Sequence, residues 1–190
     1  MGRVIIGAAA AAVAMFLLGF IFYATPLARL AYGSIDNAQA AAVQQSLAAN
    51  LPSTGTYSVP GVDTPEQTVM YGNGPIATVH YNSAGFAQMD PAALVGGLVF
   101  YFVIALLIGL ALVGIADRVR DFGARARVVV IFSVAAAAFM HLSEPIFYHH
   151  DWGHFIYLFI ADAVMLAAGG LIIARWFLGG IRTEANRAEV

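Results

Sequence analysis

The chain of 190 residues contains no cysteine, which excludes disulfide bonds, thiolate metal ligands and covalent attachment of c-type haem. Charged residues are also scarce: they make up 11% of the chain, against roughly 25% in an average soluble domain. Lysine is absent, so all nine cationic residues are arginine. The formal net charge of -2 and the lack of a basic stripe argue against a nucleic-acid partner.

Most of the chain consists of apolar residues. Hydrophobic residues make up 61% of it and the mean hydropathy is +0.78, a composition suited to lipid. Long apolar runs recur, each near the roughly 20 residues that a helix needs to cross a bilayer. We therefore predict an all-α membrane protein with four transmembrane helices, at residues 4–24, 91–116, 128–147 and 154–178.

The first run is longer than the apolar core of a secretory signal, which is about 7–15 residues. We therefore expect an uncleaved anchor. Its first half consists mainly of small residues, and Gly7, Ala11 and Ala14 follow one side of the helix at spacings of four and three. Small residues let two helix backbones approach closely. This side is predicted to be a packing surface for another membrane helix of a partner.

Residues 25–90 are more polar and rich in proline, and they separate the first two apolar runs. Asp36 is a plausible N-cap for a helix, and Thr64 with the residues that follow has the form of a capping box. Residues 56–59 and 76–81 have β-type composition and are predicted to pair. The segment is expected to form a small α+β insertion between helices 1 and 2. So short a segment buries little core of its own.

The arginines indicate the orientation. They are concentrated at Arg3, in residues 117–127 and in the C-terminal tail, 179–190, whereas the insertion has only Arg29. Because arginine and lysine accumulate in cytoplasmic loops, both termini and the tail are expected in the cytoplasm. The insertion and the turn between the third and fourth helices are then on the outer side.

The stretch from Phe139 to Asp162 holds four of the five histidines and, with Glu144, two acids at membrane depth. Ionisable groups inside a bilayer are costly, so their presence requires a reason. If the third and fourth helices form a hairpin that turns near Asp151, His141 lies level with Asp162. The first interpretation is therefore an intramembrane polar pair, His141 with Asp162, that ties the two helices together.

Two other interpretations remain open. His141, Glu144, His150 and His154 together resemble a ligand set for Zn or Cu, although their spacing matches no established signature, and haem is a related possibility with less suitable depths. A proton path through Asp162, His141 and Glu144 is the third. It is disfavoured because Ser133 is the sole polar continuation toward the cytoplasm.

Several local motifs carry a family resemblance. They are Leu51-Pro52 followed by Gly55, Tyr57 and Pro60, then Gly74-Pro75, and the outer turn from Glu144 to Gly153 with its His-His pair. Together with the N-terminal anchor, they resemble a group of small bacterial inner-membrane proteins with four helices. The resemblance implies a multi-pass protein of the bacterial inner membrane with the insertion in the periplasm. It implies no activity.

Catalytic signatures are also missing, since the sequence has no nucleophile elbow or phosphate-binding loop. We therefore expect a non-catalytic accessory or packing subunit, embedded in the lipid bilayer and bound to a larger inner-membrane complex or to itself. No cofactor is expected on this interpretation. The alternative is a periplasm-facing protein that binds Cu, Zn or a redox cofactor at the hairpin between helices 3 and 4.

Overall fold

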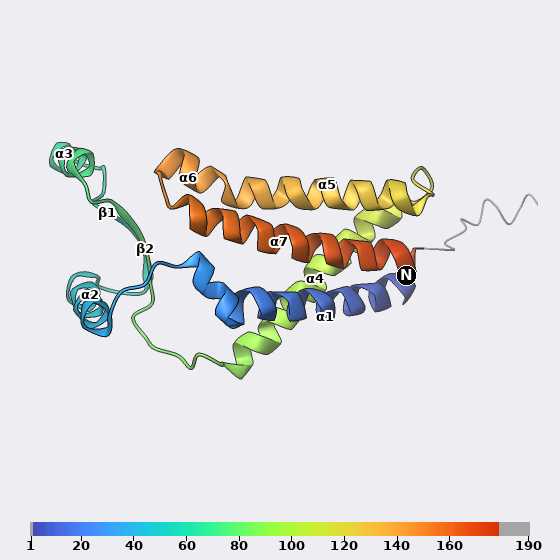
Figure 1. The fold of residues 1–190 in the computed structure, drawn as a ribbon, viewed down its shortest axis with the longest axis horizontal. Coiled ribbons are helices and arrows are strands. Elements are labelled where there is room, and N and C mark those ends of the chain that lie inside the picture. Colours follow the sequence, from blue (N-terminus) through green and yellow to red (C-terminus); the bar gives the residue numbers. More distant parts are fainter. Residues whose placement is uncertain (1, 179–190) are drawn as a thin grey trace, which may run out of the picture. The chain divides into compact units, whose positions relative to one another are not determined.

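The computed structural model describes residues 2–178, so the predicted tail, 179–190, lies outside the described residues. The chain divides into two compact units. The helical unit comprises Met1–Gly33 and Pro91–Val190, and the small unit comprises Ser34–Asp90. Each unit is described here by itself (Figure 1).

The helical unit contains four main helices: α1 (Gly2–Ala24), α4 (Pro91–Ile115), α5 (Phe122–His141) and α7 (Trp152–Ile172). A short helix, α6 (Ser143–Tyr148), follows α5, and a π-helical turn, η2 (Ile173–Phe177), continues α7. With these extensions, four helices are long and apolar enough to cross a membrane. The mostly helical fold class and the number of candidate spans agree with the sequence-based prediction.

The third span begins at Phe122, six residues before the predicted start at 128. The cause is local: the Asp121 side chain accepts a hydrogen bond from the backbone amide of Ala124, which caps the helix before the apolar run begins. Arg125 therefore lies within α5 instead of in the loop. Its side chain is only 8% exposed, and its Nε donates to the Val119 carbonyl oxygen at 2.7 Å.

The same span, predicted to end at 147, is interrupted near its end in the structure. The helix α5 stops at His141, and α6 starts two residues later. Pro145 accounts for the break, because it has no N–H to donate to the carbonyl of His141, four residues before it. The chain then reverses at His149, whose backbone adopts the left-handed conformation with φ of 55°.

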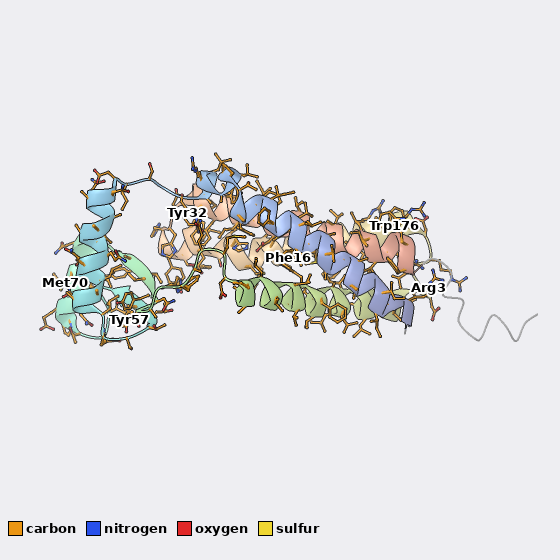
Figure 2. All side chains as sticks on the ribbon, turned by 90° about the horizontal axis from the view of Figure 1, so that it is seen from below. Arg3, Phe16, Tyr32, Tyr57, Met70 and Trp176 are labelled. Atoms are coloured by element: carbon orange, nitrogen blue, oxygen red, sulfur yellow. The ribbon has the colours of Figure 1, made fainter. Side chains whose placement is uncertain are left out.

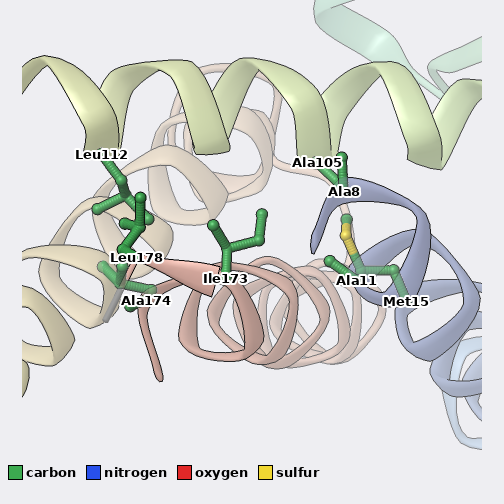
Figure 3. Packing of buried hydrophobic residues seen from close by; sticks show 9 residues of the cluster. Ala8, Ala11, Met15, Ala105, Leu112, Ile173, Ala174 and Leu178 are labelled. Carbon is green, nitrogen blue, oxygen red and sulfur yellow. The ribbon is translucent and has the colours of Figure 1, made fainter. Parts of the chain in front are cut away.

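Within the helical unit, α1 packs against α4 and α7, and α5 packs against α7 (Figure 1). The core is built of small and flexible side chains from three helices and the π-helical turn. Figure 3 shows Ala8, Ala11 and Met15 of α1, Ala105 and Leu112 of α4, Ile173 and Ala174 of η2, and Leu178, which follows η2. Alanine at these positions permits the short separations between helices.

The predicted packing surface on the first helix is used inside the molecule. Gly7 and Ala11 are buried, and Ala14 is half-buried. A Cβ atom on Gly7 would lie 2.8 Å from Cγ of Phe177, at the far end of the last helix. Within the chain, this side of α1 therefore packs on α4, α7 and η2, and its use by a separate partner stays a prediction.

The small unit contains α2 (Asn37–Asn50), β1 (Gly55–Val59), α3 (Pro65–Asn73) and β2 (Ala77–Tyr81). The strands pair in antiparallel fashion, with Tyr57 opposite Val79. Asp36 and Thr64 each form a complete capping box with the glutamine three residues on. These local predictions are confirmed.

The small unit lacks a core. None of residues 34–90 is buried, although two helices and a hairpin are formed there. Apolar side chains of α2 and of the segment before it remain accessible: Val43 is 51% exposed and Ile35 is 61% exposed. The local fold is therefore held by caps and strand pairing and not by apolar burial.

Candidate functional site

The functional candidate in the helical unit is a polar network centred on Asp162. This residue lies ten positions after the start of α7, about 15 Å along the helix. Its Oδ2 is 2.7 Å from Nε2 of His141, the last residue of α5. The two side chains are 20% and 13% exposed, so the pair is largely shielded. The structure thus brings together the two residues that the hairpin geometry placed at one depth.

The network has a third member that sequence reasoning missed. The hydroxyl of Tyr23, near the end of α1, donates to the other oxygen of Asp162, Oδ1, at 2.8 Å. Both carboxylate oxygens are therefore engaged, and one residue links α1, α5 and α7. A signal for this role existed in the sequence. Tyr23 is the only residue of α1 after Arg3 whose side chain carries a nitrogen or oxygen atom.

A second group of contacts fastens the end of α1 to α7. After α1, the chain forms a 3-10 helix, η1 (Pro26–Ala31), which packs on α7. The Ala31 carbonyl oxygen accepts a hydrogen bond from Nδ1 of His154 at 2.6 Å, and the Tyr32 ring lies 5.2 Å from the His154 ring. The Tyr157 hydroxyl donates to the carbonyl oxygen of Phe22 at 2.7 Å.

The hairpin turn contains a separate contact between an imidazole and a carboxylate. Nδ1 of His150 lies 3.2 Å from Oε2 of Glu144. The imidazole also stacks between two aromatic rings, with centroids 5.7 Å from Tyr148 and 5.7 Å from Phe155. This contact belongs to the turn and involves neither Asp162 nor His154.

The four residues predicted as metal ligands thus take part in three separate contacts. His141 pairs with Asp162, Glu144 with His150, and His154 with a backbone carbonyl. Within residues 2–178, no group of three or more histidine, aspartate or glutamate side chains is arranged to hold a metal ion. In this structure the break at Pro145 and the contacts of η1 direct the four side chains to different neighbours, and the alternative interpretation as a metal site stays a prediction.

The arrangement also lacks a continuous route for protons. Toward the other end of the bundle, α7 has no polar side chain between Asp162 and Arg175, and α5 has only Ser133 between Arg127 and His141. The contacts that the structure shows for this network are hydrogen bonds between helices. In a bilayer such bonds add stability and fix the register of the packed helices.

The two ends of the helical unit differ in charge. One end, called here the arginine end, carries Arg3, Arg118, Arg120, Arg125, Arg127 and Arg175. The opposite end, called the histidine end, carries His149, His150 and His154 with the η1 segment. Figure 2 shows Arg3 and Trp176 at one end of this unit and Tyr32 at the other. Comparisons with models of protein families, with curated proteins and with solved structures found no match.

Proposed function

We propose that this protein is a non-catalytic accessory subunit of a larger complex in a bacterial inner membrane, and that the small unit binds the partner. The observation that carries the proposal is the absence of any buried residue in 34–90. A two-stranded hairpin is marginally stable by itself, and units this small usually need disulfides, metals or association. The chain has no cysteine, and residues 34–90 contain no group of three or more side chains that could hold a metal ion, which favours association as the source of stability.

The surface offered to a partner is apolar and lies on both helices and the connecting loops of the small unit. On α3, Val69 and Met70 are 64% and 58% exposed. Other accessible apolar side chains of the unit are Ile35, Val43, Val59, Val62 and Ile76. Exposed apolar patches on soluble surfaces are typical of protein–protein contact sites.

The polar network supports a packing role for the helical unit. Asp162 joins three helices, and both of its oxygens have partners. A fully satisfied network of this kind gives a rigid membrane anchor. The small unit, which lies between α1 and α4 in the chain, is then presented from that anchor to the periplasm.

The proposed orientation gives a direct prediction. Reporter fusions after Leu51 and after Trp152 should report a periplasmic location, and fusions after Gly123 and after Val190 a cytoplasmic one. The reason is the accumulation of arginines at the arginine end. Paired reporters, one active only outside and one only inside, measure this. A cytoplasmic signal from the Leu51 fusion would reverse the proposed orientation.

The proposed function is tested by purifying the protein from its own membranes in a mild detergent. We expect a larger membrane protein to co-purify in a fixed ratio. The double substitution Val69→Gln with Met70→Gln should remove it, because it replaces apolar contact area on α3 with polar groups. Gln44→Ala with Gln45→Ala changes two exposed polar residues of α2 and serves as the matched control, which should retain the partner.

Two results would contradict the proposal. One is a wild-type protein that purifies without any stoichiometric partner. The other is a Val69→Gln, Met70→Gln variant that keeps its partner but unfolds at a lower temperature than the control. That second result would mean that the apolar side of α3 is covered within the chain itself.

A further inference from the structure

An apolar groove lies between α4 and α5 near the arginine end. Its volume is about 420 Å³, within the range of roughly 300–1,000 Å³ that is usual for ligand sites. Nine of the ten residues that line it are apolar, and Ser133 is the exception. The lining consists of Ile108, Ala111, Leu112 and Ile115 of α4, Val128, Val129, Phe132, Ser133 and Ala136 of α5, and Leu166 of α7.

The groove exists because the two helices do not close on each other. Although α4 and α5 are consecutive, α4 packs mainly on α1, whereas α5 packs on α7. Small side chains at Ala111 and Ala136, one on each wall, keep the space between them open. The groove is open along one side, so in a membrane its occupant would come from the surrounding lipid.

The groove leads to positive charge on both walls. On α5 the lining positions recur every three to four residues, and one turn before Val129 the same face carries Arg125. On α4 the lining ends at Ile115, and the helical turn continues to Arg118, whose backbone amide donates to the Ile115 carbonyl. Residues 117–127 contain four arginines and two aspartates, and the Asp121 carboxylate caps α5.

We propose that this groove binds an anionic phospholipid. One acyl chain lies along the apolar lining, and the headgroup phosphate is held by Arg118, which is exposed and follows the α4 lining within one turn. Arg125 supports the site, because its bond to Val119 holds the loop against α5. Clusters of arginine beside an apolar surface select anionic headgroups, and basic pockets between membrane helices bind them. The inference rests on the proposed membrane insertion but not on the proposed partner.

The probe is phosphatidylglycerol, with phosphatidylcholine of identical acyl chains as the neutral comparison. The purified, delipidated protein is titrated with each lipid in mixed micelles, and thermal unfolding is followed. Phosphatidylglycerol should raise the unfolding temperature and phosphatidylcholine should not. Arg118→Gln should weaken binding about fivefold, because one arginine near an anionic surface contributes about that factor. Arg29→Gln, which removes the same charge at the histidine end, should leave binding unchanged.

A second pair of variants tests the apolar part. Ala136→Phe fills the groove and should abolish the phosphatidylglycerol shift. Ala135→Phe, at the neighbouring exposed position outside the lining, should preserve it. Unfolding without added lipid shows whether both variants fold as the wild type does. Should Ala136→Phe fail to fold, the Arg118→Gln variant decides the question by itself.

Three outcomes would overturn the assignment. If both lipids raised the unfolding temperature equally, the groove would not select an anionic headgroup through arginine. An unchanged shift in Ala136→Phe would place the lipid elsewhere. Soluble glycerol phosphate that is as effective as phosphatidylglycerol would mean that a free anion, not a lipid, is recognised. None of these results depends on whether a protein partner binds the small unit.

Discussion

Replacing Gly170 by leucine should destabilise the purified protein strongly, or prevent it from accumulating in the membrane. A Cβ atom at Gly170 of α7 would lie 2.6 Å from Cγ1 and 3.3 Å from Cγ2 of Val129 on α5. Valine in a helix has one strongly preferred rotamer, so it cannot turn aside. The α5–α7 contact would have to open, and overpacking of this kind typically costs about 1–3 kcal/mol, with a larger side chain at the upper end.

The matched control is Gly114→Leu. A Cβ atom at Gly114 of α4 would meet nothing within 4 Å, and the residue is exposed. Since leucine favours helix more than glycine does, this variant should unfold at or above the wild-type temperature. Thermal unfolding in detergent measures both. If both variants lowered the unfolding temperature equally, the larger side chain itself, and not the α5–α7 contact, would be responsible for the loss of stability.

Asp162→Leu should have the second-largest effect. It removes the acceptor of both the Tyr23 hydroxyl and the His141 imidazole. One interhelical hydrogen bond in a membrane protein contributes about 0.6 kcal/mol on average and up to about 1.7, so losing two should cost roughly 1–3 kcal/mol. Tyr23→Phe, which removes one bond, should cost less. Unfolding by denaturant in micelles gives the free energies.

Two further variants sharpen this test. Asp162→Asn retains an acceptor for Tyr23 and a polar group opposite His141, so it should keep most of the stability. The triple change Tyr23→Phe, His141→Leu, Asp162→Leu leaves no unpaired polar group and should recover part of what Asp162→Leu loses. If the triple variant is no more stable than Asp162→Leu, the network contributes through packing and not through hydrogen bonds.

Features that depend on neighbouring residues could be read from the sequence. The caps at Asp36 and Thr64 need only the residue three positions on, and both are formed. The pairing of His141 with Asp162 follows from equal distances to one turn, because antiparallel helices convert sequence distance into depth. Hairpin geometry is in this sense still local, since one short turn sets it.

Features that depend on contacts between helices distant in the sequence could not be predicted from the sequence. The periodicity of α1 shows that Gly7 and Ala11 share a side, but not that α7 and its extension cover that side. Tyr23 was missed for the same reason, because its partner on α7 is 139 residues away. The early start of α5 had a local signal in Asp121, but Arg125 directed the prediction toward a loop.

The fastening of η1 to α7 has a mechanical consequence. Ala31 and Tyr32 are held by His154, immediately before the small unit begins at Ser34. A force on the small unit from that side is therefore transmitted through Ala31 and Tyr32 to the first turn of α7, and not to the end of α1 at Ala24. Gly33 is the first residue after this contact, and a Cβ atom built on it would meet nothing within 4 Å. Load that would otherwise fray α1 is carried instead by the contact with α7.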